Sequence, residues 1–465
     1  MNSSKLEPCV KLPLPSKELE EVIEKAKDWL LMHGACMRSK EQLNKDEVSY
    51  TPFVLTPSSF PRKEFEKAIA VQKILNELTH KVAHDHNFLT EILKSTVEVD
   101  DFTAKLFHIY ETVYSEGFTQ SISLGLLRSD YLLHSLCDNN ILQVELNTIA
   151  SSFAGIVTVI SEYHRYVLKE LGHEDRLENI PENKALSGFC DGLIDAWKLY
   201  NNEQAIILFV VEDETYNICD QRFHEFEIRQ KNPRIKIIRK SLGKLASEAY
   251  LDHNQELIVE TFTVAVVYFR SGYEPAQYPT EHQWSARLML ERSRAIKCPS
   301  IQYHLAGTKK IQQALAVSGT LEKYFKETSI VEKIQKIFTG LYSLDFDEEG
   351  EKALAMGLKE PERFVLKPQR EGGGNNVYDE NVRVKLEAMR NSKERTAWIL
   401  MDRIRPPFQM NYLIRPGNSD KPEVQDVITE LGIYGVILGT SDEIRINRQV
   451  GHILRTKPAN ENEGG

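Results

Sequence analysis

The chain has 465 residues, a net charge of -10 and six cysteines, and these values exclude several classes of protein. Its length suits about three structural units of ordinary size. With 41% hydrophobic and 27% charged residues, it has the composition of a folded globular protein rather than a disordered one. We expect no nucleic-acid partner, because the net charge is negative and the sequence contains no basic patch.

The cysteines and the apolar runs indicate the compartment. The six cysteines are scattered without a C-x-x-C pair, which argues against a disulfide framework or a zinc site. No apolar run reaches the ~20 residues that span a bilayer, and the start of the sequence lacks a basic segment followed by an apolar stretch. We expect a soluble, cytosolic (cytoplasmic) protein that does not bind a membrane.

The first elements predicted in chain order are two amphipathic helices. Apolar residues recur at helical spacing from about Ser16 to Gly34, and again after Pro61, a residue suited to the first turn of a helix. His80 and His84 stand four apart on the second helix, which suits a metal pair, but no third ligand accompanies them. We therefore expect both histidines on a solvated helix face.

The segment 141–148 predicts a strand with one polar face. Period-two alternation places Gln143, Glu145 and Asn147 on the same side of it. Two oxygen ligands two residues apart, joined by a carboxylate such as Glu371, suit Mg²⁺. Two carboxylates about 4 Å apart would repel by roughly 4 kcal/mol at an effective dielectric of 20, which a cation relieves. The alternative is the polar outer face of an antiparallel strand.

Between residues 203 and 273 the pattern changes to apolar runs that alternate with helix-like stretches. We predict the order strand, helix, strand, helix, strand. Near-continuous apolar strands such as 206–211 are typical of a parallel sheet covered on both faces. We interpret the segment as an inserted α/β domain whose strand ends, near Glu212 and Arg270, present ligand-binding loops.

The strongest local signal is the segment 367–376, KPQREGGGNN, which follows an apolar strand. Its three glycines let backbone N–H groups approach a polyphosphate, and Lys367 supplies a positive charge. The segment is neither a Walker A loop nor a dinucleotide-binding fingerprint. We favour a nucleotide clamp over the alternative of a flexible surface loop. The charged, turn-rich residues 345–363 are interpreted as a hinge into a mobile lid, and three more strands are predicted after residue 397.

Several basic residues follow predicted strands or turns. They include Arg128, Arg270 and Arg455, together with the pair Lys309 and Lys310. Arginine offers a rigid fork to carboxylates, so the set indicates a substrate with carboxylate groups. Each of these residues alone is also consistent with an ordinary surface charge.

Seven segments together resemble one known family. They are RSDY from Arg128, VELNTIASSFAG from Val144, YFRSGY from Tyr268, CPSIQYHLAGTKKIQQ from Cys298, VLKPQREGGGNN from Val365, ELGIYGV from Glu430 and HILRTK from His452. In this order they resemble the eukaryotic glutathione synthetases, which are ATP-grasp ligases. The resemblance covers most of the chain, and KPQREGGGNN and LAGTKK are highly specific to that family.

The resemblance implies an α/β (α+β) fold of the ATP-grasp type, with an antiparallel-sheet core, an inserted parallel α/β substrate domain and a lid. Helices and the N-terminal part of the core are expected in residues 1–203, and the inserted domain in residues 204–306. The C-terminal part of the core is expected in residues 307–465. The lid would span about 345–415 and carry the glycine-rich loop 371–376. A homodimer is also implied.

The reaction implied by the resemblance joins γ-glutamylcysteine to glycine, which is the second step of glutathione biosynthesis. The dipeptide carboxylate would attack the γ-phosphate of ATP, and the glycine amine would displace phosphate from the acyl phosphate. One or two Mg²⁺ ions per subunit would be the cofactor. Because no side-chain nucleophile is required, catalysis would come from positioning and charge stabilisation.

The resemblance also assigns residues to each role. Mg²⁺ would be held by Glu145, Asn147 and Glu371. Catalysis is assigned to Arg128, Lys309, Lys367 and Arg455. ATP binding is assigned to Arg128, Lys309, Lys367, Gly372, Gly373, Gly374, Asn375, Asn376, Tyr378, Met401, Asp402, Arg403, Ile404, Glu430, Lys457 and Glu463. Dipeptide binding is assigned to Arg128, Ser151, Ser152, Thr215, Tyr216, Asn217, Gln221, Arg270, Ser271, Gly272, Tyr273 and Arg455.

Three departures from the family pattern keep alternatives open. Ala150 and Ser151 stand in the reverse order of some members, and Thr215 stands where some relatives have glutamate. We expect a member of this family to continue past Gly465 into an alanine-rich loop and a final strand, which help to select the acceptor. One alternative is therefore a ligase that joins β-alanine or serine. Another is a catalytically silent nucleotide-binding protein, which the retained metal ligands and lysines argue against.

Overall fold

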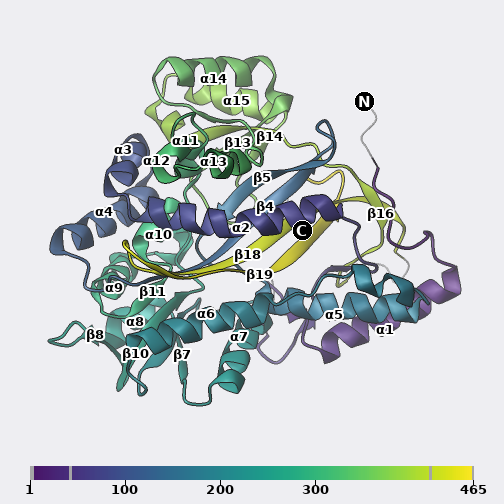
Figure 1. Ribbon diagram of the computed structural model, residues 1–465, viewed down its shortest axis with the longest axis horizontal. Coiled ribbons are helices and arrows are strands. Elements are labelled where there is room, and N and C mark those ends of the chain that lie inside the picture. The colour runs from purple at the N-terminus through teal and green to yellow at the C-terminus, as the bar shows by residue number, and fades with distance from the viewer. Residues whose placement is uncertain (1–4, 41–43, 418–421, 463–465) are drawn as a thin grey trace.

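The computed structural model describes residues 5–40, 44–417 and 422–462. In these residues, helices cover both faces of a large sheet, and a smaller sheet with its own helices stands beside it (Figure 1). The expected mixed α/β class is confirmed. No helix in the described ranges combines the length and the apolar character needed to cross a bilayer.

Eleven strands of the described residues form the large sheet. Its order is β16-β18-β4-β11-β10-β6-β7; β19 pairs with β18, β5 with β4, β9 with β10, and β8 with β9. The strands are β4 (Ser123–His134), β5 (Asn140–Asn147), β6 (Ile206–Val210), β7 (Ile237–Lys240), β8 (Ala249–Leu251), β9 (Leu257–Val259), β10 (Phe262–Phe269), β11 (Ile296–Cys298), β16 (Gln409–Asn411), β18 (Gln425–Gly439) and β19 (Ile444–Pro458).

One half of this sheet is antiparallel and the other half is parallel. β18 pairs antiparallel with β4 and β19, whereas β11, β10, β6 and β7 continue from β4 in parallel pairs. The predicted parallel sheet is therefore confirmed, and all five residues of β6 are buried, as expected for a strand covered on both faces. Since β11 pairs with β4, the parallel strands extend the antiparallel ones in one sheet. The boundaries predicted for the three units stay a prediction.

Two helices pack against opposite faces of the large sheet and form an apolar core with it on each side. α2 (Arg62–Ala83) and α6 (Ala185–Tyr200) contact β18 and β4 from opposite sides (Figure 1). Alternate residues of β18 therefore enter different apolar clusters, Ile433 and Ile437 on the side of α2, and Val436 and Leu438 on the side of α6.

The helices expected after Ser16 and Pro61 are confirmed as α1 and α2. The other helices around the large sheet are α1 (Ser16–Met32), α3 (His86–Val97), α4 (Asp101–Glu116), α5 (Ala154–Glu170), α7 (Ile218–Lys231), α8 (Leu242–Glu248), α9 (Glu281–Arg292), α10 (Ile301–Ala306), α11 (Lys309–Leu315), α12 (Leu321–Tyr324), α13 (Thr328–Gln335) and the 3-10 turns η1 (Glu174–Asn179) and η2 (Pro275–Gln277). Two short pairs complete this part, β1 (Cys36–Met37) with β2 (Ser49–Tyr50) and β3 (Phe53–Val54) with β17 (Leu413–Ile414).

The second sheet has the order β12-β15-β13-β14. Its strands and helices are β12 (Leu341–Ser343), β13 (Phe364–Pro368), β14 (Val377–Tyr378), β15 (Trp398–Asp402), α14 (Glu348–Lys359), α15 (Glu380–Met389), η3 (Pro361–Arg363) and η4 (Lys393–Ala397). The strands predicted after residue 397 are confirmed as β15, β18 and β19. Side chains from both helices and from β13 and β15 share one apolar cluster.

The turn-rich interpretation of residues 345–363 is wrong, because most of this segment is helix α14. The side chain of Asp347 accepts a hydrogen bond from the backbone N–H of Gly350 (2.7 Å) and so caps the helix. Glu348 and Glu349 follow in the first turn, where negative charge is favourable. The charged residues that suggested a loop therefore mark the start of a helix.

His80 does not lie on a solvated helix face, contrary to the sequence-based expectation. It is 2% exposed on α2. Its Nε2 donates to the carbonyl of Thr440 (2.8 Å), so Nδ1 is unprotonated and accepts from the hydroxyl of Tyr303 (2.6 Å). The next turn holds His84, which donates from Nδ1 to the carbonyl of His80 (2.8 Å). Burial, followed by repulsion from His84, lowers the pKa of His80 to about 4.

We expect His80 to make the fold sensitive to mild acid. Its folded pKa of about 4 lies below the value near 6.5 of an unfolded histidine. The unfolded chain therefore binds a proton that the folded chain does not, so stability holds above pH 6.5. Between pH 6.5 and about 4 it falls, by up to roughly 3 kcal/mol from this group. His80→Gln is expected to flatten the curve of unfolding free energy against pH, measured by urea denaturation. The control is His108→Gln, which replaces an exposed histidine. A wild-type slope in His80→Gln would contradict the assignment of this pH dependence to His80.

Candidate active site

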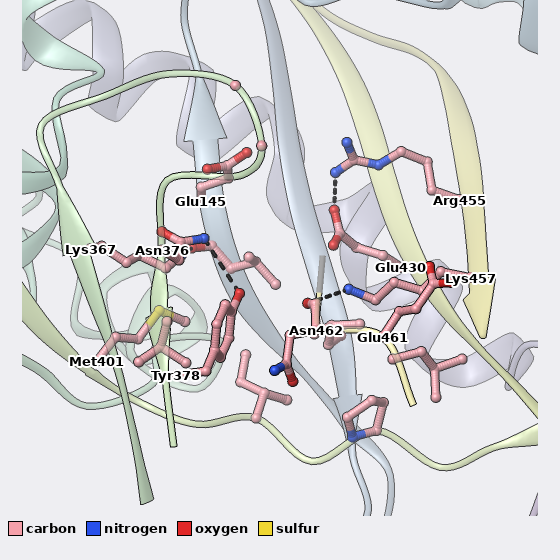
Figure 2. A pocket seen from close by; sticks show the side chains of 18 of the residues that line it. Glu145, Lys367, Asn376, Tyr378, Met401, Glu430, Arg455, Lys457, Glu461 and Asn462 are labelled. Carbon is pink, nitrogen blue, oxygen red and sulfur yellow. Dashed lines mark hydrogen bonds and ion pairs between the residues drawn. The ribbon is translucent and has the colours of Figure 1, made fainter. Parts of the chain in front are cut away.

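A cavity of about 850 Å³ lies between the two sheets. β4, β5, β18 and β19 line it from the large sheet, and β13, β14, β15 and the glycine-rich loop line it from the second sheet. Figure 2 shows the two linings facing each other, with Lys367 and Asn376 from the side of the second sheet and Glu430 and Arg455 from the large sheet, to which Glu145 on β5 also belongs.

Most residues predicted for ATP, metal and catalysis line this cavity. They are Arg128, Glu145, Asn147, Lys367, Glu371, Gly372, Gly373, Asn376, Tyr378, Met401, Asp402, Arg403, Ile404, Glu430, Arg455 and Lys457. Lys309 is not in the lining but contacts Glu145 and Glu371, which are. Gly374 and Asn375 belong to the same loop without lining the cavity, and Glu463 lies outside the described residues.

The residues predicted for the dipeptide are split. Arg128, Ser152, Tyr216, Tyr273 and Arg455 line the cavity. The others do not line it: Ser151, Thr215, Asn217, Gln221, Arg270, Ser271 and Gly272. Six of these seven are buried at 6% exposure or less, so their side chains face protein and not the open cavity.

A bulge in β5 decides which polar residues reach the cavity. Asp130 pairs with Glu145 and Tyr131 pairs with Gln143, which leaves Val144 as an extra residue. Glu145 and Asn147 both line the cavity, as the alternation predicted. The prediction for Gln143 is wrong: it donates instead to the hydroxyl of Ser129 (2.7 Å), because the bulge reverses the two faces.

Glu145 and Glu371 converge on one ammonium group. Lys309 Nζ lies 3.1 Å from Glu145 Oε2 and 3.3 Å from both carboxylate oxygens of Glu371. Burial raises the pKa of Glu371 to about 7, with Lys309 opposing the shift and repulsion from Glu145 adding to it. Burial also acts to raise the pKa of Glu145, but the positive charges of Lys309, Lys367 and two arginines outweigh burial and hold this pKa well below the usual range. The two carboxylates therefore share a strongly cationic environment.

The donor set around Lys309 suits a hard cation. Two carboxylates and the amide of Asn147 lie together, and the amide nitrogen donates to Glu145 Oε1 (3.3 Å) and to Asp130 Oδ2 (3.0 Å). This leaves the amide oxygen as the remaining ligand atom. Among the described residues, no group of three His, Cys, Asp or Glu side chains is arranged to hold a metal. A Mg²⁺ ion here would therefore rely on bound water and phosphate oxygens as well, which is usual for this ion.

Lys367 and the glycine-rich loop form one wall of the cavity. Lys367 is 4% exposed on β13, and its Nζ donates to the carbonyl of the bulge residue Val144 (3.0 Å). Gly372 and Gly374 have φ angles of 84° and 89°, which other residues rarely adopt. A Cβ on either glycine would meet no atom within 4 Å. The backbone conformation rather than crowding therefore explains glycine at these positions.

One part of the cavity lining is apolar. It consists of Val365, Met401, Ile404, Phe408 and Ile428. Such a surface suits a planar ring like adenine, with polar groups at its edge for orientation. Val365, Phe408 and Ile428 were not predicted, although Val365 stands two residues before Lys367 on the same strand. Period-two alternation was the signal for it.

Arg270 is held in a buried ion pair at the end of β10. Its Nη2 donates to Asp220 Oδ2 (3.1 Å) and to the hydroxyl of Ser152 (3.0 Å). Asp220, 0% exposed, also accepts the backbone N–H groups of Phe153 and Gly155, both at 2.9 Å. Arg270 thus reaches the cavity through Ser152 rather than by lining it.

Comparison with known proteins identifies the family. The sequence pattern described as "Eukaryotic glutathione synthase, ATP binding domain" matches residues 16–465. The chain belongs to this family.

Relatives of full length support the assignment to the eukaryotic glutathione synthases. Glutathione synthetase of Xenopus laevis is 43% identical over 454 residues, which is 97% of this chain and 95% of that protein. The Homo sapiens protein is 42% identical over 454 residues, 97% and 94% of the two chains. The chloroplastic glutathione synthetase of Solanum lycopersicum is 39% identical over 463 residues, which is 97% of this chain and 83% of that protein.

A solved structure shares the fold of this glutathione synthase family member. It is a glutathione synthetase-like effector from Globodera pallida, with a TM-score of 0.77, 25% sequence identity and 96% coverage of both chains. The two-sheet arrangement described above is therefore the fold of this glutathione synthetase-like protein.

Sequence reasoning missed several polar residues in this glutathione synthase site, among them Asp130, Asp220 and Asn462. Asp130 and Asp220 are the buried partners of Arg128 and Arg270. Asn462 accepts from Lys457 Nζ at its carbonyl (2.6 Å) and from Arg403 Nη2 at its side chain (2.9 Å), so it connects the two sheets across the cavity (Figure 2). Asp130 stands inside the RSDY segment, which was the available signal. No local signal marks Asp220 or Asn462.

Proposed function

We propose that this chain is a glutathione synthetase, an ATP-dependent ligase that joins γ-glutamylcysteine to glycine and releases ADP and phosphate. Membership of the family supports the reaction. The observation that carries the proposal is the cavity between the sheets, where two lysines, two arginines and two carboxylates meet: Lys309, Lys367, Arg128, Arg455, Glu145 and Glu371.

The phosphate groups of ATP would lie against the second sheet. Lys367 is at hydrogen-bonding distance from a backbone carbonyl, which a phosphate oxygen would replace as its partner. The positive φ angles of Gly372 and Gly374 turn the loop so that backbone N–H groups can approach a polyphosphate. Adenine would occupy the apolar part of the lining near Met401 and Ile404.

Arg128 and Arg455 would orient the carboxylate of the dipeptide for attack on the γ-phosphate. Both line the cavity, and together they bring two fixed positive charges to the place where the acyl phosphate forms. Catalysis then depends on positioning and charge stabilisation, since no side-chain nucleophile takes part. The glycine-rich loop would keep water from the acyl phosphate by closing over it.

Mg²⁺ is the proposed cofactor, with Glu145, Asn147 and Glu371 as the residues that would hold it. When bound, it would neutralise charge on the phosphate groups. The contact of both carboxylates with Lys309 supports a cation-binding role for this position.

We also propose a homodimer in the cytosol. The family resemblance supports the dimer, and light scattering on purified protein tests it. Six unpaired cysteines fit a reducing compartment. Two plant relatives are described as chloroplastic, so cell fractionation is needed to decide between the compartments.

The test of the reaction is phosphate release from ATP with purified protein, Mg²⁺ and γ-glutamylcysteine. Glycine is compared with β-alanine, serine and no acceptor, and the product is identified by mass spectrometry. Glycine-dependent release with the matching tripeptide is the expected result. Release that favours another acceptor would replace the proposal with an altered ligase, and no release from folded, ATP-binding protein would overturn it.

A further inference from the structure

Asp130 is a fully buried carboxylate beside the cavity. It lies on β4 opposite Glu145 of β5 and Gly432 of β18, and its exposed fraction is 0%. It does not line the cavity, and none of the roles above is assigned to it. A carboxylate removed from water is costly unless donors surround it, so its partners explain why it is there.

The carboxylate of Asp130 accepts four hydrogen bonds, which come from three residues that line the cavity. Arg128 donates from Nε to Oδ1 (2.7 Å) and from Nη2 to Oδ2 (2.8 Å), which is a bidentate contact. Arg455 Nη2 (3.0 Å) and Asn147 Nδ2 (3.0 Å) both donate to Oδ2. One carboxylate therefore connects β4, β5 and β19 at the point where their polar side chains enter the site.

These contacts fix which atoms the three partners present. The bidentate contact uses Nε and Nη2 of Arg128 and leaves Nη1, which donates to the carbonyl of Ser152 (3.3 Å). Asn147 gives its amide nitrogen to Asp130, so the amide oxygen, the atom that suits a cation, is on the other side. Without this acceptor the amide has less reason to keep that orientation.

Gly432 provides an independent sign that the Arg128–Asp130 pair shapes its surroundings. A Cβ on Gly432 would lie 2.6 Å from Asp130 Oδ1 and 3.0 Å from Arg128 Cδ. The φ angle of Gly432 is not in the left-handed region, so its backbone does not require glycine. Glycine is instead required by the space that the Arg128–Asp130 pair occupies. The side chain of Ile453, which a Cβ on Gly432 would meet at 2.6 Å, adds to this requirement.

We propose that Asp130 is a positioning residue of the ligase site. It holds Arg128, Arg455 and Asn147 in the orientations in which they meet the dipeptide carboxylate and the cation. This inference rests on the proposed function. A purely structural ion pair would stabilise the fold without fixing any of these groups relative to the reactants.

The test uses Asp130→Asn in the full chain, with Gly432→Ala as a second variant. An asparagine keeps the shape but replaces one acceptor oxygen by a donor, which then faces the nitrogens of Arg128 or of its neighbours. The matched control is Glu291→Gln. Glu291 is 4% exposed and pairs with the buried Arg287 (2.9 Å) away from the cavity lining. Four quantities are measured: kcat and KM for the dipeptide, Mn²⁺ binding by electron paramagnetic resonance, and the melting temperature.

We expect Asp130→Asn to lower kcat/KM for the dipeptide by about 10- to 100-fold and to weaken Mn²⁺ binding by a similar factor. Gly432→Ala is expected to shift both quantities in the same direction, and it carries the test if Asp130→Asn fails to fold. Glu291→Gln is expected to lower the melting temperature alone.

Loss of stability in Asp130→Asn and Gly432→Ala with wild-type KM and Mn²⁺ binding would overturn the inference and leave the proposed function intact. If the wild-type protein makes no tripeptide, the proposed function fails instead. Mn²⁺ binding still decides in that case whether Asp130 orients Asn147, because it is measured without turnover.

Discussion

Replacing Glu371 by glutamine is expected to lower kcat by about 10²-fold or more, the size found when one electrostatic contact to a reacting group is removed. Glu371 and Glu145 share the Lys309 ammonium at 3.3 and 3.1 Å. Glutamine keeps the shape of the side chain but removes one of the two negative charges. The remaining site would hold Mg²⁺ more weakly, so initial rates plotted against Mg²⁺ concentration should saturate later than in the wild-type protein.

The control for this variant is Glu387→Gln, which removes an exposed carboxylate from α15 in the same part of the chain. It is expected to leave both kcat and the Mg²⁺ dependence unchanged. A Glu371→Gln protein with a wild-type Mg²⁺ curve would show that Glu371 pairs with Lys309 without holding the metal.

Replacing Asp220 by alanine is expected to reduce the free energy of unfolding by about 3–5 kcal/mol. The side chain of Arg270 is 1% exposed and would be left as a buried charge without its carboxylate partner. The backbone N–H groups of Phe153 and Gly155 at the start of α5 would lose their acceptor as well. Urea denaturation of the purified variant measures the loss.

A double variant separates the two causes. Asp220→Ala with Arg270→Met removes both charges, so it should recover part of the lost stability, whereas the uncapped start of α5 stays uncapped in both proteins. Asp191→Ala is the surface control, because Asp191 pairs with Lys231 at 43% exposure and should change stability by less than about 1 kcal/mol. A double variant less stable than Asp220→Ala alone would contradict a dominant role for the unpaired arginine.

The sequence predicted much of the cavity because its residues repeat a local pattern. Glu145 and Asn147, and Arg455 with Lys457, are predicted pairs two residues apart on strands, and each pair lines the cavity. Lys367 has the same relation to Val365, which was not predicted. In a strand, this spacing alone places two side chains on one face.

Other features were not predictable from local spacing, since they depend on residues far apart in the chain. The bulge at Val144 follows from the pairing of β5 with β4, and it reverses the expected place of Gln143. His80 is buried because Tyr303 and Thr440, more than 200 residues away, close over α2. The contact between Asp220 and Arg270 likewise joins a helix to the end of a strand 50 residues later.

The sequence by itself determined the family, the strands on either side of the glycine-rich loop, and the i, i+2 pairs Glu145–Asn147 and Arg455–Lys457 that line the cavity. Only the tertiary structure decided how their charges are balanced. Asp130 collects Arg128, Asn147 and Arg455, and Lys309 collects Glu145 and Glu371. The physical reason is that a buried charge needs a partner within hydrogen-bonding distance, and that partner is supplied by whichever strand the fold brings alongside, irrespective of its place in the sequence.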